Sequence, residues 1–160
     1  MYSTIEEQLD ALIGTSIAEL DIPEHLYELA VSRYEQVGDW LSERYWDDPA
    51  CEVYPQGSFR LGTVVRPIDP AVDYDIDLVC RLGLQKESTT QADLKRDVGL
   101  GLTAYVNNGA DGKPSVKERK RCWTLEYRTD PFHMDVLPAI PDADGATRNT
   151  NPAFGLHVPG

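Results

Sequence analysis

The sequence predicts an α+β fold, a mixed β-sheet with a long N-terminal helix packed on it. Residues 21–46 carry apolar side chains at helical spacing, whereas residues 74–82 and 132–140 are short apolar runs typical of buried strands. The chain has 160 residues, 41% of them hydrophobic and 26% charged, which is the composition of one globular domain with its own core.

The first predicted helix covers residues 4–13. Thr4 and Glu7 have the spacing of a capping box, and Gly14 is expected to end the helix. Its apolar stripe consists of Ile5, Leu9, Leu12 and Ile13.

The second predicted helix, residues 21–46, is the long one. Asp21 is its expected N-terminal cap, Pro23 stands in the first turn, and Glu24 is expected to reach back to the cap. Its predicted buried face is formed by Leu26, Leu29, Ala30, Tyr34, Val37 and Leu41.

The remaining segments predict a sheet and one further helix. Residues 90–106 have helical spacing, although Gly99 and Gly101 lower their helix propensity. Residues 141–160 are rich in Pro, Asp, Asn and Gly and predict a loop-like tail. Strands are expected at 52–56, 74–82, 115–127 and 132–140.

Charge and cysteine content narrow the function classes. The 27 Asp and Glu residues outnumber the 15 Lys and Arg residues, and a formal net charge of −12 argues against strong nucleic-acid binding. The absence of a long apolar run and of a signal peptide leads us to expect a cytoplasmic protein without membrane contact. The three cysteines lack the spacing of a zinc ribbon or a disulfide framework, and Cys80 and Cys122 are interpreted as buried, reduced thiols.

Two carboxylates in one predicted strand are the main functional signal. Side chains alternate along a strand, so Asp75 and Asp77 project from the same face, while Ile76 and Leu78 face the core. The Cα atoms of the two Asp residues are expected to lie about 6.6 Å apart. Adjacent carboxylates repel each other unless a cation lies between them. Oxygen ligands of this kind suit Mg²⁺, with Mn²⁺ as a substitute, and Mg²⁺ commonly bridges carboxylates and substrate phosphates.

A third carboxylate, Asp135, interrupts the apolar run 132–140. If this strand lies beside the Asp75/Asp77 strand, the three carboxylates could hold two metal ions and act on an attacking hydroxyl and a leaving pyrophosphate. The alternative for Asp135 is a structural ion pair with a buried Arg. His133 lies on the same face and is interpreted as a packed strand residue, because Mg²⁺ favours oxygen ligands.

The turn Gln56-Gly57-Ser58 follows the first predicted strand. Backbone N–H groups and the Ser58 hydroxyl at such a turn can hold nucleotide phosphates. The alternative is a plain turn from strand to helix.

These motifs resemble the DNA polymerase β-like nucleotidyltransferases. The segments Pro55–Thr63, Asp73–Val79 and Met134–Ala139 are more closely similar to the bacterial CD-NTases, relatives of cyclic GMP-AMP synthase. The resemblance covers roughly residues 25–142 and implies a catalytic lobe with the long helix as its spine.

The resemblance also implies activity and site residues. A CD-NTase joins NTPs into a cyclic or linear oligonucleotide signal used in anti-phage defence. Catalytic and Mg²⁺-binding roles then fall to Asp75, Asp77 and Asp135, and nucleotide binding falls to Gln56, Gly57 and Ser58. The helical lobe that follows the catalytic lobe in this family has no counterpart in residues 1–160, so a nucleotide-binding module without catalysis is the alternative function. Transfer of a nucleotide onto a protein or small molecule is another.

Three further features stay open at this stage. Asp73 forms a second Asp-x-Asp pair with Asp75 but is interpreted as a solvated or supporting group. The basic run Lys113–Arg121 could contact the triphosphate or an acidic activator, or form a solvated strand edge. Asp142–Gly145 is rejected as a calcium loop because the later Glu is missing.

Overall fold

A computed structural model of the chain describes residues 4–45, 47–67, 69 and 72–141, without side chains at 17–19. The elements, in chain order, are α1 (Ile5–Leu20), α2 (Glu24–Arg44), β1 (Glu52–Gln56), α3 (Gly57–Leu61), β2 (Tyr74–Arg81), α4 (Gln91–Asn107), β3 (Ser115–Glu118), β4 (Trp123–Glu126) and β5 (Phe132–Ala139). Among these residues, none of the helices has the length and apolar character needed to cross a membrane.

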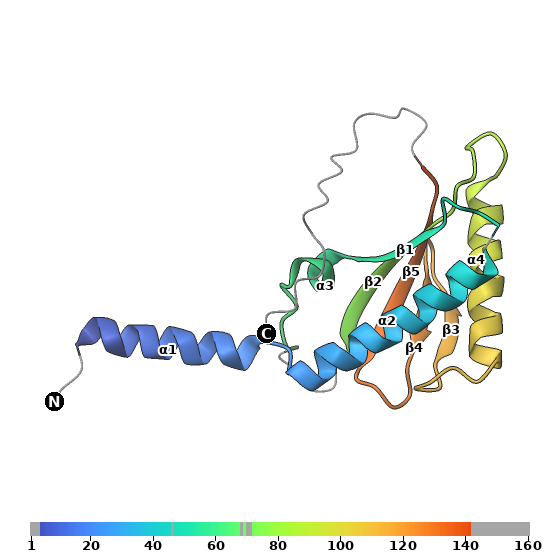
Figure 1. The fold of residues 1–160 in the computed structure, drawn as a ribbon. Helices are drawn as coiled ribbons and strands as arrows, with labels where there is room; N and C mark the ends of the chain where they lie inside the picture. Colours follow the sequence, from blue (N-terminus) through green and yellow to red (C-terminus); the bar gives the residue numbers. More distant parts are fainter. Residues whose placement is uncertain (1–3, 46, 68, 70–71, 142–160) are drawn as a thin grey trace.

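The five strands form one mixed sheet in the order β1-β2-β5-β4-β3 (Figure 1). Strands β2 and β5 are parallel neighbours at its centre, and the other pairs are antiparallel. Helix α2 contacts β1, β2 and α4, and α4 also contacts β3 and β5. The architecture confirms the α+β prediction of a mixed sheet with the long helix packed on it.

The hydrophobic core fills the space between helices α2 and α4 and one face of the sheet. Side chains alternate along β2, so Ile76, Leu78 and Cys80 are fully buried while Asp75 and Asp77 lie on the other face. The helices contribute Ala30, Tyr34, Val37 and Leu41 from α2 and Leu94, Val98, Leu102 and Tyr105 from α4. The buried face of α2 was predicted, and it leaves the opposite face of the sheet for the carboxylates.

Two glycines let α4 approach its neighbours closely. A Cβ on Gly99 would lie 2.2 Å from the Trp123 ring, and one on Gly101 would lie 2.9 Å from Arg44. The Trp123 indole N–H donates to the Lys95 carbonyl at 2.8 Å, which holds β4 against the helix. The low helix propensity of the two glycines is therefore offset by packing, and Thr90 caps the helix by accepting a hydrogen bond from the Asp93 N–H.

Three predicted boundaries were wrong. Helix α1 begins with the expected capping box of Thr4 and Glu7 but continues past Gly14 to Leu20, since one glycine costs a helix only about 1 kcal/mol. Pro23, not Asp21, is the N-cap of α2, and Asp21 instead forms an isolated bridge with Val65. The expected strand 115–127 is a hairpin of β3 and β4.

Helix α1 extends away from the sheet (Figure 1), and its apolar stripe is exposed. The exposed fractions are 83% for Ile5, 53% for Leu9, 64% for Leu12 and 48% for Ile13. The helix prediction was right in kind, but this stripe contributes nothing to the core.

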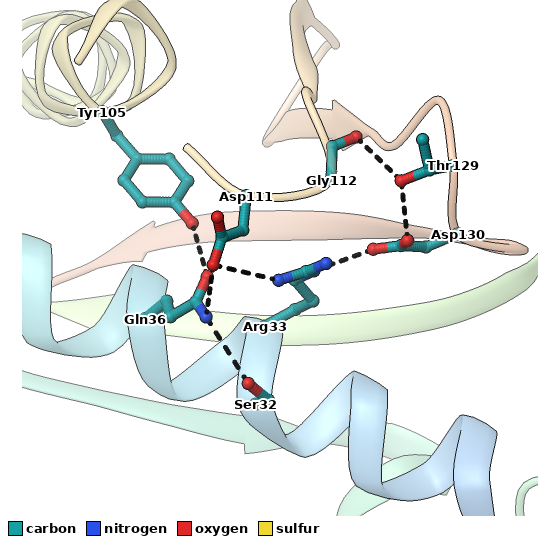
Figure 2. Close-up of polar contacts among 8 residues, drawn as sticks. All are labelled: Ser32, Arg33, Gln36, Tyr105, Asp111, Gly112, Thr129 and Asp130. Carbon is teal, nitrogen blue, oxygen red and sulfur yellow. Dashed lines mark hydrogen bonds and ion pairs between the residues drawn. The ribbon is translucent and has the colours of Figure 1, made fainter. Parts of the chain in front are cut away.

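A buried ion pair fastens α2 to the segment that leads into β5. Arg33 Nε lies 2.8 Å from Asp130 Oδ2, and the two side chains are 12% and 6% exposed. Figure 2 shows how Asp111, Gln36 and Thr129 extend this contact into a network. The network holds the residues that lead into β5 in place. It therefore helps to fix the register of β5 against β2.

Candidate metal and nucleotide site

Three carboxylates meet where β2 and β5 run side by side. In the parallel register Asp77 is opposite Asp135, and Asp75 is opposite His133. One carboxylate oxygen from each of Asp75, Asp77 and Asp135 lies within 4.8 Å of the other two. The two predicted carboxylate strands are thus direct neighbours, and their acidic side chains share one face.

The cluster is electrostatically unfavourable without a cation. Partial burial raises the pKa of Asp77, and the negative charges of Asp75 and Asp135 raise it further. His133 Nε2 lies 3.3 Å from Asp75 Oδ1 and offsets this only in part. The sequence interpretation of His133 as a packed strand residue missed its pairing with Asp75. The period-2 spacing of His133 and Asp135 had already placed His133 on the face of the carboxylates.

Asp135 is held by donors from β4 and from the turn that precedes it. The Thr124 hydroxyl donates to Asp135 Oδ1 at 2.5 Å, and the Cys122 thiol donates to Oδ2 at 3.4 Å. Burial raises the pKa of Cys122 to about 11, and the bond to the Asp135 carboxylate contributes to this rise. Sequence reasoning assigned neither residue to the site; the signal for Thr124 was a hydroxyl in a short apolar run.

The alternative of Asp135 as partner of a buried Arg does not hold for the described residues. The two arginines with nearly buried side chains are committed elsewhere, Arg33 to Asp130 and Arg81 to Glu52. No Lys or Arg in the described part of the chain forms an ion pair with Asp135.

The Gln56-Gly57-Ser58 turn borders the cluster. Gln56 is the register partner of Asp77, and Gly57 begins α3 with a φ of +64°. A Cβ at Gly57 would lie 2.7 Å from Asp77 Oδ2. Only glycine meets both requirements, so the backbone of this turn and the exposed Ser58 lie immediately beside the acidic cluster.

Other sequence candidates lie elsewhere. Asp73 is exposed at the entrance to β2 and is not part of the three-carboxylate cluster. The basic run Lys113–Arg121 covers β3 and its turn, where Lys117 and Arg119 pair with Glu126. These pairs support the interpretation as a strand edge. The segment Asp142–Gly145 and the rest of the predicted loop-like tail, residues 142–160, lie outside the described residues.

The donor set fits a divalent cation. Three carboxylates supply hard oxygen ligands on one sheet face, and burial, together with the negative charges of Asp75 and Asp135, raises the pKa of Asp77. A cation bound at these oxygens would remove the repulsion that the chain's own residues leave in place.

Residues 51–138 match the family model described as "Cyclic GMP-AMP synthase DncV-like, nucleotidyltransferase domain". The chain belongs to this family. The matched segment runs from the residue before β1 to the penultimate residue of β5 and includes the whole cluster. The resemblance to the CD-NTases is therefore confirmed.

Curated relatives include two cyclic dinucleotide synthases. A c-di-GMP synthase of Roseivirga ehrenbergii is 24% identical over 138 residues, which are 85% of this chain and 35% of the relative. The cyclic dinucleotide synthase CdnG of Bradyrhizobium diazoefficiens is 26% identical over 140 residues, 83% of this chain and 30% of the relative. The chain thus spans about a third of the length of these relatives.

Solved structures show the same fold. The CD-NTase CdnG of B. diazoefficiens in complex with GTP matches with a TM-score of 0.62 and 26% identity, over 79% of this chain and 36% of that one. Vibrio cholerae DncV in complex with the linear intermediate pppA(3',5')pG matches with a TM-score of 0.59 and 12% identity, over 81% of this chain and 49% of that one. At that identity the second match shows the fold alone.

Proposed function

We propose that this protein is a Mg²⁺-dependent nucleotidyltransferase that joins NTPs into a cyclic or linear oligonucleotide messenger. The observation that carries the proposal is the cluster of Asp75, Asp77 and Asp135, beside a glycine turn, in a family of nucleotidyltransferase domains.

Each group in the site has a proposed role. Asp75, Asp77 and Asp135 are the catalytic carboxylates, and their clustered oxygens would hold the metal. When bound there, Mg²⁺ supplies charge neutralisation for the triphosphate and Lewis-acid activation of the acceptor hydroxyl. Gly57 has no side chain to cover its backbone, so a phosphate oxygen can approach the N–H groups of the turn, and further nucleotide contacts are assigned to its chain neighbours Gln56 and Ser58.

The relatives support the choice of substrate. CdnG is solved with GTP and DncV with a linear dinucleotide intermediate, and the curated relatives are cyclic dinucleotide synthases. A net charge of −12 makes a metal ion the natural mediator between this chain and an anionic nucleotide. Family membership, rather than geometry, supports the further part of the proposal, a signal used in anti-phage defence inside the cell.

Product analysis with labelled NTPs and Mg²⁺ tests the function. We expect nucleotide joining in the wild type. In Asp75→Ala/Asp77→Ala the rate should fall on the order of 10³-fold, because the metal ion that would stabilise the charge of the transition state could no longer bind. Asp73→Ala is the matched control, since it removes an exposed Asp of the same segment that lies outside the cluster, and it should stay active.

Two results would contradict the assignment. Activity that survives in the double variant would exclude the cluster as the catalytic site, and loss of activity in Asp73→Ala alone would place the active pair two residues earlier. Label that ends on the protein rather than on an oligonucleotide would mean that a protein side chain is the acceptor.

A further inference from the structure

Thr124 is a buried polar residue directly opposite a proposed metal ligand. It lies in β4 between Trp123 and Leu125, is 2% exposed, and is the register partner of Asp135. A buried hydroxyl is costly unless it is hydrogen-bonded, and valine would fill the same volume without that cost. The hydroxyl therefore has a use in this strand, and its hydrogen bond to Asp135 Oδ1 at 2.5 Å identifies it.

Arg119 fixes the direction of this hydrogen bond. Its Nε–H donates to Thr124 Oγ1 at 3.2 Å. Since a guanidinium only donates and a hydroxyl has one proton, the Thr124 proton is left for Asp135. The Arg119 backbone N–H also donates to the Cys122 carbonyl at 3.0 Å and holds the turn between β3 and β4 in place.

The second donor to Asp135 is weaker. The Cys122 thiol contacts Oδ2 at 3.4 Å, and an S–H group is a poor hydrogen-bond donor. Orientation of the carboxylate therefore depends on Thr124, whose bond is short and is strengthened by the cationic donor behind it.

We propose that Thr124, itself oriented by Arg119, is a positioning residue that fixes the Asp135 carboxylate for divalent-metal binding. The inference rests on the proposed function and deepens it by adding the support of one ligand. Groups that orient metal ligands commonly change metal affinity by about 10- to 100-fold when they are removed.

The test measures Mn²⁺ affinity by electron paramagnetic resonance in the presence of a non-hydrolysable NTP analogue. Thr124→Val should weaken Mn²⁺ binding by about 10- to 100-fold, and Thr124→Ser, which keeps the hydroxyl, should stay within about threefold of the wild type. Thr103→Val is the control for the loss of a hydroxyl elsewhere, because Thr103 is exposed on α4 and, within the described residues, its hydroxyl donates to the Gly99 carbonyl.

Arg119→Gln gives a second, exposed variant that tests the relay without altering the core. It should weaken Mn²⁺ binding, whereas Lys117→Gln, which removes the other cation on Glu126, should not. Circular dichroism and thermal melts check that each variant is folded.

The outcomes separate the inference from the proposed function. If Asp135→Asn weakens Mn²⁺ binding and Thr124→Val does not, or if Thr124→Ser is as weak as Thr124→Val, the positioning role is wrong while the metal site stands. If Asp77→Asn and Asp135→Asn bind Mn²⁺ as well as the wild type, the proposed metal site is wrong, and the role of Thr124 is overturned with it.

Discussion

Asp130 and Asp135 belong to the same segment of the chain, but the protein neutralises them in different ways. The Asp130 side chain is 6% exposed and is paired with a cation of the chain itself, Arg33, at 2.8 Å. Asp135 lies further along, in β5, where the nearby carboxylates are Asp75 and Asp77 and the direct donors are neutral. The first carboxylate is part of the scaffold, and the second belongs to a cluster whose charge calls for an external cation.

The strongest way to break the comparison is to remove the built-in cation. Arg33→Met leaves Asp130 buried without its partner and should lower the free energy of unfolding by about 3–5 kcal/mol. Urea unfolding measures it. Arg96→Met, which breaks an exposed pair with Asp93, should lower the free energy of unfolding far less, because solvent screens this pair. Equal losses in the two variants would mean that the Arg33 pair is not structurally special.

Supplying the external cation should sharpen the comparison. Mg²⁺ with ATP or GTP at 100 times the dissociation constant should stabilise the protein by about 2.7 kcal/mol, since the ligand binds only the folded state. Thermal melts should lose this shift in EDTA and in Asp135→Asn. A shift of the same size with nucleotide in EDTA would mean that the Lys113–Arg121 run holds the phosphates and that the metal-centred mechanism is wrong.

A smaller effect reports on the charge of Asp135 through Cys122. Its pKa, raised to about 11 by burial and by the Asp135 carboxylate, should fall in Asp135→Asn. Alkylation at pH 8 should then become faster by up to about tenfold, because the thiolate is the reactive form. A Cys51→Ser background removes the other partly exposed thiol. An unchanged rate would show that Asp135 carries no charge near the thiol.

The smallest expected effect is the pH dependence of the metal-free protein. The pKa of Asp77 is raised from 3.8, so the folded state binds the proton more tightly than the unfolded state does. The resulting stability is present at low pH and is lost as the pH rises from 3.8 through the raised value. In EDTA, Asp77→Asn should lose less stability over this window and melt slightly higher at pH 7. If the wild type and Asp77→Asn had the same melting temperature at every pH from 3 to 7, this repulsion would be excluded.

Local rules predicted much of the site. Strand periodicity alone placed Asp75 and Asp77 on one face, and the apolar residues that alternate with them, Ile76 and Leu78, faced the core as expected. The pairing of Asp77 with Asp135 could not be read in this way, because a parallel neighbour is chosen by packing between distant segments. The family resemblance, rather than periodicity, supplied that contact in advance.

The supporting residues were missed for a local reason. Thr124 and Cys122 were assigned to one long strand, 115–127, because the turn at 119–122 is Arg-Lys-Arg-Cys and has none of the residues that mark tight turns. The turn is instead held by the Arg119–Cys122 backbone bond, with Arg119 also paired to Glu126. Such a hairpin follows from tertiary packing and ion pairs rather than from turn propensity.

The close contact between α4 and Trp123 makes the site vulnerable at a distance. A side chain at residue 99 would displace the Trp123 ring, and the neighbouring residue in β4 is Thr124, which bonds to Asp135. Gly99 lies next to Trp123 and not next to the cluster. A methyl group at residue 99 would still disturb Asp135, because a shift of Trp123 would move Thr124. In a genetic screen for loss of function, this helix position should be hit as readily as a residue of the active site.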